Sequence, residues 1–287
     1  MWRRRFVTWG IAIAVFAMRI VFPVLIVSLI AWIGPIDALY LAATDPGEYS
    51  RLLASAELEV SAFGGAFLAM VAMKHFLDVE KDRHWIAVIE RPLSRLGRIE
   101  AVEIGVVLVL LWLTSRSLPI GDQSAFLAAG ALGLVAYIAV DGIAAVLEPR
   151  GAASSVVARS GLASFLYLEV LDASFSFDGV IGALALTSNF FIIAIGLGIG
   201  AMFVRSLTLL LVEKDALTEY RYLAHGAFYA IGSLSIIMFL KTLLHVPEGV
   251  SGMIGAAFIG LAFLDSVRHN RELRRDRERG IGASGRS

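Results

Sequence analysis

Three acidic side chains lie inside an apolar stretch that is long enough to cross a bilayer. The stretch, residues 162–186, reads LASFLYLEVLDASFSFDGVIGALAL and contains Glu169, Asp172 and Asp178. On insertion scales a charged side chain at mid-membrane costs roughly 2.5 to 3.5 kcal/mol, so such residues usually face a partner, a cavity or an ion path. We therefore expect this segment to carry the functional site.

Asp172 and Asp178 cannot share one ion in a regular helix. Six residues of α-helix separate them by roughly 120° around the axis and about 9 Å along it. The two carboxylates cooperate only if the helix unwinds between them, or if each faces a carboxylate from another part of the protein. Gly179 and Gly182 favour such a break, because irregular backbone is tolerated where it lines a cavity. Glu169 shares a helix face with Asp172 and is predicted to provide access or to relay protons.

Four basic residues also lie inside apolar stretches, and they form two matched pairs: Arg19, Lys74, Arg205 and Lys241. In each case a glycine precedes the basic residue by nine positions, in the segments GIAIAVFAMR (10–19), GLGIGAMFVR (196–205), GAFLAMVAMK (65–74) and GSLSIIMFLK (232–241). The two kinds of segment occur in the same order in each half of the chain. This pattern predicts an inverted repeat, a recurring design of secondary transporters, whose sites lie where the repeats meet.

The basic residues of the repeat admit two interpretations. Arg19 and Arg205 are predicted to act as gating counter-charges, or alternatively to form salt bridges with the intramembrane aspartates that only determine the fold. Lys74 and Lys241 are assigned the same counter-charge role. Because both lie near the ends of their stretches, extension of their ammonium groups to the lipid headgroups explains them at least as well.

Several other polar features receive a structural interpretation. Gly196 and Gly200 superficially resemble a dinucleotide-binding loop, but they lie in an apolar stretch with no preceding strand, so close helix packing explains them better. Asp141 is interpreted as an interface residue. The five histidines lie at span ends and in loops without the spacing of metal ligands, so we assign them no metal role.

Composition places the whole chain in a membrane. Of its 287 residues, 58% are hydrophobic and 17% are charged, and the mean hydropathy is +0.77, which leaves too little polar surface for a soluble protein. Eight stretches have the length and polarity of a membrane-spanning helix: residues 6–32, 57–77, 100–118, 124–147, 162–186, 189–212, 222–244 and 251–268. We predict an all-α polytopic bundle of about eight transmembrane helices.

The bundle is predicted to form a single transmembrane domain over residues 1–270. It comprises a first repeat half (6–77), linking spans (100–147), a second repeat half (162–244) and a final span (251–268), followed by a charged, partly disordered tail (271–287). Positively charged flanks stay cytoplasmic, and 19 of the 25 Lys and Arg residues fall on one side, against only Arg51 and Arg116 in the opposite loops. We therefore expect a multi-pass protein of the inner (plasma) membrane with both termini cytoplasmic.

A family resemblance is carried by residues 169–207, EVLDASFSFDGVIGALALTSNFFIIAIGLGIGAMFVRSL. They resemble the second signature of the TerC-type, or tellurium-resistance, integral membrane proteins of the lysine-exporter superfamily. RRFVTWGIAIAVFAMRIVFPVLIVSL, FGGAFL, EKDRHW and ASFSFDGVIGA are similar to a branch of unknown function. The family pattern is an acid, five residues, then Asp, once in each half; Asp172 and Asp178 match its second copy. The first copy would precede Met1, so we expect a late start assignment or an N-terminal truncation.

The resemblance implies a divalent-cation exporter, with Mn²⁺ as the expected cargo and an older link to tellurite resistance. Hard oxygen ligands suit Mn²⁺, Mg²⁺ or Ca²⁺, and the absence of cysteine argues against soft metals. Asp172, Asp178 and Glu169 are then the metal-interacting acids. No cofactor, nucleic-acid partner or enzymatic activity is expected, and the lipid bilayer is the main partner. The alternative is a non-transporting membrane scaffold or a metal-stress response protein.

Overall fold

The structure, a computed structural model, describes residues 20–78, 85–97, 99, 101–147, 179–180, 183, 187, 189–213, 220–244 and 246–284. The regular secondary structure in those residues is helical throughout. In chain order the α-helices are α2 (Phe22–Ala31), α3 (Pro35–Thr44), α4 (Pro46–Ser55), α5 (Glu57–Phe76), α6 (Ala87–Leu96), α7 (Val102–Arg116), α8 (Ile120–Leu147), α10 (Phe190–Glu213), α12 (Leu223–Lys241) and α13 (Glu248–Ser284). The all-α prediction is therefore correct for the described part of the chain.

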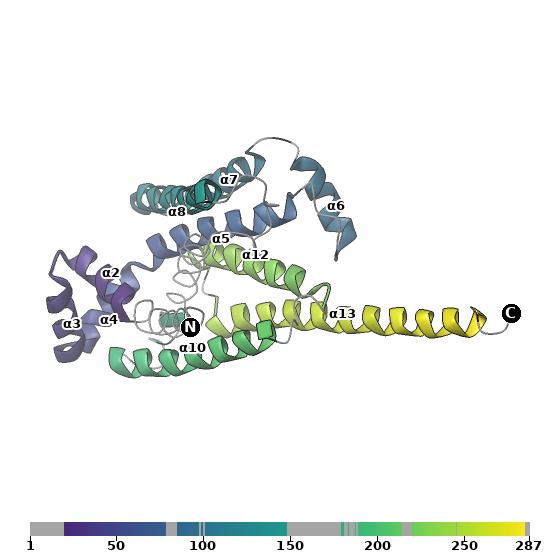
Figure 1. The fold of residues 1–287 in the computed structure, drawn as a ribbon. Helices are drawn as coiled ribbons and strands as arrows, with labels where there is room; N and C mark the ends of the chain where they lie inside the picture. Colours follow the sequence, from purple (N-terminus) through teal and green to yellow (C-terminus); the bar gives the residue numbers. More distant parts are fainter. Residues whose placement is uncertain are drawn as a thin grey trace.

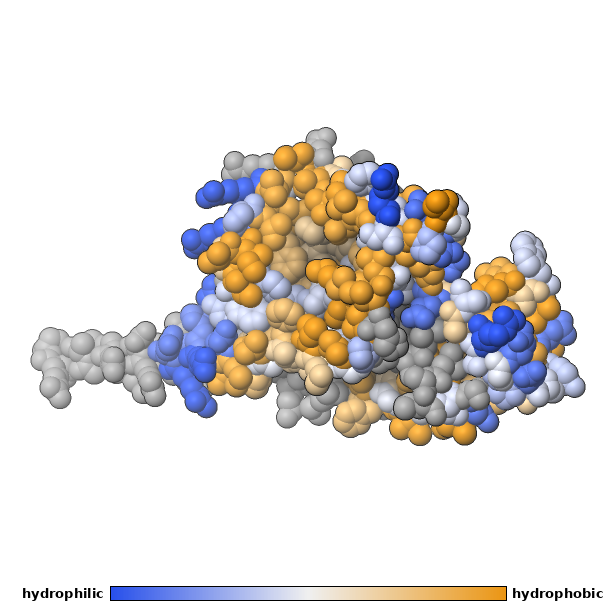
Figure 2. Space-filling model, turned by 180° about the vertical axis from the view of Figure 1, so that it is seen from behind, coloured by the Kyte–Doolittle hydropathy of each residue, from blue (hydrophilic) through white to orange (hydrophobic). Residues whose placement is uncertain are grey.

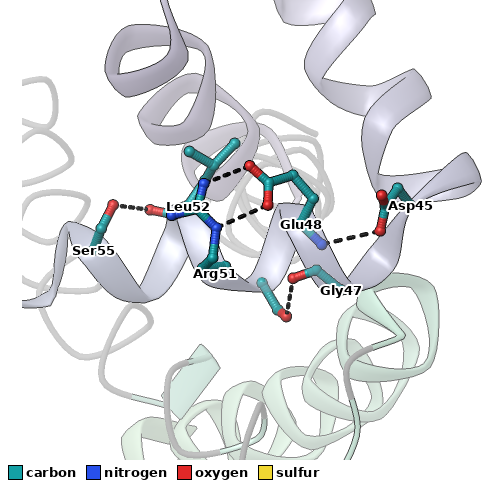
Figure 3. Close-up of polar contacts among 7 residues, drawn as sticks. Asp45, Gly47, Glu48, Arg51, Leu52 and Ser55 are labelled. Atoms are coloured by element: carbon teal, nitrogen blue, oxygen red, sulfur yellow. Dashed lines mark hydrogen bonds and ion pairs between the residues drawn. The ribbon is translucent and has the colours of Figure 1, made fainter.

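Two short helices, α3 and α4, occupy the connection between the first two predicted spans. α2 ends at Trp32, whose φ of 53° is left-handed, and Pro35 starts α3 because proline suits the first helical turn. The axes of α2 and α3 consequently differ by 100°. Asp45 caps α4 by accepting a hydrogen bond from the Glu48 N–H at 3.1 Å (Figure 3). One turn later Arg51 pairs with the Glu48 carboxylate at 2.5 Å.

α5 is the central helix of the bundle and lies between α8 and α12 (Figure 1). Between Ser61 and Ala72 all its residues except Phe63 are buried, and many of them are glycine or alanine. Small side chains let neighbouring helix backbones approach closely. A Cβ added at Gly133 of α8 would lie 2.3 Å from the carbonyl oxygen of Phe63, so only glycine fits this crossing.

α13 packs antiparallel to α12 and extends beyond the bundle (Figure 1). A Cβ added at Gly226 of α12 would lie 2.5 Å from the Cβ of Ala262, and the Tyr222 N–H donates to Ser266 Oγ at 2.8 Å. The helix continues without a break to Ser284, whereas the sequence predicts a span ending at 268 and a partly disordered tail. Arginine and glutamate at spacings of three and four residues favour this helical continuation.

The predicted count of eight spans is met only in part. Three described helices are long and apolar enough to cross a membrane: Ile120–Gly142, Leu223–Lys241 and Gly249–Glu272. The number rises to five if each of two bent helix pairs, α2 with α3 and α4 with α5, is one span. α7 has 15 residues, a length of about 22 Å against a hydrocarbon core of about 30 Å. Residues 6–19 and most of 162–186 lie outside the described residues.

Large apolar side chains are exposed along the outer faces of the bundle. They are most frequent on α7, α8, α10 and α13, with examples at Trp112, Leu132, Phe203 and Leu261. Figure 2 shows apolar surface over the middle of the molecule and hydrophilic residues towards its two ends. Extended exposed apolar surface marks contact with a membrane or another protein. The chain therefore has the architecture of a helical membrane protein.

Candidate functional site

The three predicted metal-interacting acids fall outside the described residues. The counter-charge Arg19 and the helix-break glycine Gly182 also lie outside them. Five predicted site residues are therefore not placed: Glu169, Asp172, Asp178, Arg19 and Gly182. The structure does describe residues close to them in the sequence, including Ile20, Gly179 and Val180.

The segment that follows Asp178 packs against the first helices of the chain. Val180 is fully buried in an apolar cluster, which we call the α2–α4–α10 cluster after the helices that supply its larger buried members: Val24, Val27, Tyr49, Leu53, Phe190 and Ile193. The remaining buried members are alanines, including Ala38 and Ala42 of α3. Ile20 packs against the same cluster and is the sequence neighbour of Arg19. The cluster therefore joins a residue two positions after the predicted acid Asp178 to the residue next to the predicted counter-charge Arg19, although the two are 160 positions apart.

Tyr49 brings a polar group into the α2–α4–α10 cluster. Its side chain is fully buried, and its ring centroid lies 4.9 Å from that of Phe190. Among the described residues its hydroxyl oxygen has no hydrogen-bond partner. Burying such a hydroxyl costs about 1 to 3 kcal/mol, so it calls for an explanation such as a ligand or a water. Sequence reasoning missed Tyr49, for which the available signal was its four-residue spacing from Leu53 on one helix face.

Lys74 has a carboxylate partner on a neighbouring helix. Its Nζ lies 2.6 Å from Asp141 Oδ2, with the lysine side chain 50% exposed and the aspartate 27% exposed. The pair links α5 to α8. These helices run in the same direction, since Phe63 lies against Gly133 and, further along both helices, Lys74 lies against Asp141. Lys74 is therefore the counter-charge of a carboxylate, but of one that the sequence suggested only as an interface residue.

The two helices that carry the Gly-to-Lys repeat pack against each other in antiparallel orientation. A Cβ added at Gly65 of α5 would lie 3.0 Å from Phe239, and one added at Gly232 of α12 would lie 3.4 Å from Ala72. Each repeat glycine thus meets the residue seven positions after the other glycine. Ser235 Oγ also donates a hydrogen bond to the carbonyl oxygen of Gly65 at 2.8 Å. The contact is reciprocal, because each glycine faces the other helix.

Lys241 lies at the opposite end of this helix pair from Lys74. It lines an open pocket of about 440 Å³ between the start of α5 and the end of α12. The pocket is also lined by Glu57, Ser61 and Thr242. Charges of both signs beside hydroxyls make this a polar opening rather than an apolar ligand site.

The predicted glycine contacts on α10 are not found in the part of the chain that the structure describes. No described atom lies within 4 Å of a Cβ built at Gly196 or Gly200, and one built at Gly179 meets only Leu197 at an ordinary 3.8 Å. α10 instead exposes large apolar side chains. The close helix crossings occur on other helices, at Gly133 and Gly226. Arg205 belongs to α10, and its side chain lies outside the described set.

A buried glutamate forms the most enclosed charged site in the described residues, and sequence reasoning missed it. The side chain of Glu90, in the first turn of α6, is 1% exposed. Its Oε1 accepts hydrogen bonds from the backbone N–H groups of Trp85 at 3.2 Å and Ile86 at 3.3 Å, and from the Tyr229 hydroxyl at 3.3 Å. Its Oε2 lies 3.9 Å from His225 Nε2. We call Glu90, His225 and Tyr229 the Glu90 cluster.

The Glu90 cluster connects α6 to three other helices. His75 at the end of α5 stacks on Phe228, with ring centroids 3.7 Å apart, and its ring lies 5.4 Å from that of His225. Trp85 Nε1 donates to Asp265 of α13 at 3.0 Å. No group of three or more potential metal ligands is found among the described residues. The cluster positions α6 on the bundle.

The chain was compared with protein families, curated proteins and solved structures. A family model described as "Protein of unknown function (DUF475)" matches residues 1–273. Neither the curated proteins nor the solved structures gave a match. The family match covers almost the whole chain, and its description attaches no activity to it.

Proposed function

Because the chain belongs to this family of unknown function, we propose from its own residues that it exports a divalent metal cation across the membrane, with Mn²⁺ as the first cargo to test. The carrying observation is the pair Asp172 and Asp178 in an otherwise apolar, membrane-length segment. Each carboxylate there costs several kcal/mol unless a positive species compensates it. A cation that passes or rests beside them supplies that compensation.

The available ligand chemistry favours a hard cation. The chain has no cysteine, so thiolate ligands for zinc or copper(I) are missing from its sequence. Carboxylate, carbonyl and hydroxyl oxygens suit Mn²⁺, Mg²⁺ and Ca²⁺. The TerC-type resemblance of residues 169–207 points to the same class of cargo.

The surroundings of the acidic segment support this proposal. Val180, two residues after Asp178, and Ile20, next to Arg19, belong to the same apolar contact region. The buried Tyr49 hydroxyl lies in that region as well. A cation site there would have an oxygen donor from α4 within the cluster that anchors the end of the acidic segment.

The antiparallel packing of α5 and α12 supports an inverted-repeat transporter. Their reciprocal glycine contacts are the arrangement expected where two repeats of opposite direction meet, which is where transporter sites form. Asp172 and Asp178 are proposed as the cation-interacting acids, Glu169 as the access or proton group, and Arg19 and Arg205 as gating counter-charges.

A non-transporting scaffold, including a role in metal or tellurite stress, is the second candidate. The observation that favours it is the Lys74–Asp141 pair, in which a span-end lysine simply ties α5 to α8. If the other intramembrane charges pair in the same way, they organise helices and move no ion.

Reconstitution of the purified chain distinguishes the two functions. Proteoliposomes are loaded with a Mn²⁺-sensitive fluorophore, and a Mn²⁺ gradient is imposed across the membrane. The unaltered chain is compared with Asp172→Asn, Asp178→Asn and, as a matched control, Asp122→Asn, whose acid lies exposed in the first turn of α8.

Export predicts Mn²⁺ flux above that of protein-free liposomes, a loss of at least tenfold in the two intramembrane variants, and no change in Asp122→Asn. Flux equal to that of protein-free liposomes would rule out the transport proposal and leave the scaffold. Normal flux in both intramembrane variants would retain transport and remove those aspartates from the site. Mg²⁺ and Ca²⁺ added as competitors then rank the cargo ions.

A further inference from the structure

Helix α6 combines an inward charge with an outward apolar face. Glu90 is buried against α12, while Val88 is 85% exposed, Ile89 46% and Leu96 47%. Pro92 is also exposed. At 100° per residue these four outward side chains span about 100° of the helix circumference, and Glu90 lies on the opposite side. The sequence places this segment between the predicted spans 57–77 and 100–118.

The Glu90 cluster fixes which face of α6 turns outward. Oε1 of Glu90 accepts three hydrogen bonds, two from the backbone that precedes α6 and one from Tyr229. Trp85 is held separately by Asp265 of α13. Rotation of α6 about its axis would break the hydrogen bond between Tyr229 and Glu90 and expose the carboxylate. The Glu90 cluster therefore keeps the apolar face of α6 on the outside of the bundle.

Cationic side chains border the apolar face. Arg91 and Arg95 of α6 are exposed, and they lie at the edge of the face in the helical projection. On α13, Arg268 pairs with Asp265 at 3.5 Å, which is the residue that Trp85 contacts, and Arg271 lies one turn further on and is exposed. The described acids at this end include the buried Glu90, the paired Asp265, and the exposed Asp78 and Glu272.

Figure 1 shows α6 lying across the end of α5 instead of continuing it. In Figure 2 apolar and hydrophilic surfaces adjoin at the end of the molecule where α6 and α13 lie. A short helix at the end of a membrane-length bundle, apolar on one face and edged by arginine, has the properties of a helix that lies in the membrane interface.

We infer that α6 is an interfacial helix that binds the acidic phospholipids of the adjacent leaflet. Val88, Ile89, Pro92 and Leu96 enter the headgroup–acyl boundary, and Arg91 and Arg95 contact anionic headgroups. Each arginine near an acidic membrane surface contributes roughly a fivefold gain in lipid affinity. This assignment stands whether or not the protein moves a metal ion.

The test uses single cysteines in the full chain, which contains none of its own. Val88→Cys on the outward face and Ser94→Cys on the opposite side of the same helix each receive a nitroxide. The protein is reconstituted in phosphatidylcholine vesicles and in vesicles of phosphatidylcholine and phosphatidylglycerol at a ratio of about 3:1. Collisional relaxation by oxygen and by a water-soluble nickel complex reports whether each label lies in lipid or in water.

We expect the label at 88 to be accessible to oxygen and shielded from nickel. The label at 94 should be less accessible to oxygen and less shielded from nickel. The shielding at 88 should rise with phosphatidylglycerol content. In an Arg91→Gln/Arg95→Gln background the gain in shielding at 88 between the two vesicle types should be at least about fivefold smaller. Arg116→Gln, an exposed cation at the end of α7, is the matched control and should leave it unchanged.

Equal nickel access at 88 and 94 in both vesicle types would overturn the inference. Shielding at 88 that ignores phosphatidylglycerol would overturn the acidic-lipid part. A label-to-label distance below about 25 Å between two copies, appearing together with the shielding, would assign the face to a protein interface and also overturn it.

Discussion

Replacement of Glu90 tests whether the Glu90 cluster holds α6 on the bundle. Glu90→Ala removes an acceptor of three hydrogen bonds at 3.2, 3.3 and 3.3 Å. At about 1 kcal/mol for each hydrogen bond, the loss is about 3 kcal/mol. Glu90→Gln keeps an oxygen at the Oε1 position and is expected to cost about 1 kcal/mol or less. The two variants therefore separate the hydrogen bonds from the charge.

The assay has a global and a local readout. Unfolding of the purified protein in detergent gives the change in free energy, and amide hydrogen exchange over residues 85–97 reports the attachment of α6. Glu90→Ala should raise the exchange rate there by roughly a hundredfold, the equivalent of about 3 kcal/mol. Glu48→Ala, which removes an exposed glutamate of α4, is the control for loss of a carboxylate as such.

If Glu90→Ala changes neither the free energy of unfolding nor the amide exchange of α6, this reasoning is refuted. If its free energy of unfolding and its α6 exchange both match those of the unaltered chain within about 0.5 kcal/mol, the cluster does not hold the helix. If Glu90→Gln is as damaging as Glu90→Ala, the negative charge beside His225, and not the hydrogen bonds, carries the effect.

Three further outcomes follow from the packing. Gly133→Ala, which would drive a Cβ into a backbone oxygen of α5 at 2.3 Å, should lower the free energy of unfolding by about 3 kcal/mol, whereas Gly105→Ala, with open space around it, should be neutral. A double-mutant cycle on Lys74 and Asp141 in the same unfolding assay should return a coupling of about 0.5 to 1 kcal/mol, because the pair is partly exposed. Tyr49→Phe should preserve or raise stability in thermal unfolding, since it removes a buried hydroxyl without a described partner; a loss above about 1 kcal/mol would mean that the hydroxyl is satisfied.

The described charged residues have two kinds of partner. Lys74 and Glu90 contact other helices, through Asp141 of α8 and Tyr229 of α12. Arg51 and Arg268 instead pair within their own helices, with Glu48 and Asp265.

Helix positions were the most predictable property. The span predicted at 57–77 corresponds to α5 at Glu57–Phe76, and that predicted at 222–244 corresponds to α12 at Leu223–Lys241. Apolar length is a local property that survives in any arrangement of helices. Prediction was weaker where local signals conflict, as at Trp32 to Pro35, where α2 and α3 part at 100°.

Which residues form a site was much less predictable. Glu90 lies in a segment whose arginines suggest a solvated loop, and the residue that accounts for its burial, Tyr229, is 139 positions away. Gly196 shares with Gly65 the spacing of nine residues to a basic side chain, yet among the described residues no atom lies within 4 Å of a Cβ built at Gly196, whereas one built at Gly65 lies 3.0 Å from Phe239.

The amino-acid sequence by itself determines that the chain is helical, that it is apolar enough for a membrane, and where acids and bases interrupt its apolar stretches. These properties depend on residues close together in the chain, whose periodicity and transfer free energy do not need a partner. Only the tertiary structure decides that the repeat glycines meet reciprocally, that Lys74 faces Asp141, and that Glu90 is buried while the other side of α6 stays exposed. Those contacts join residues far apart in the chain, and their energies exist only once the helices have packed.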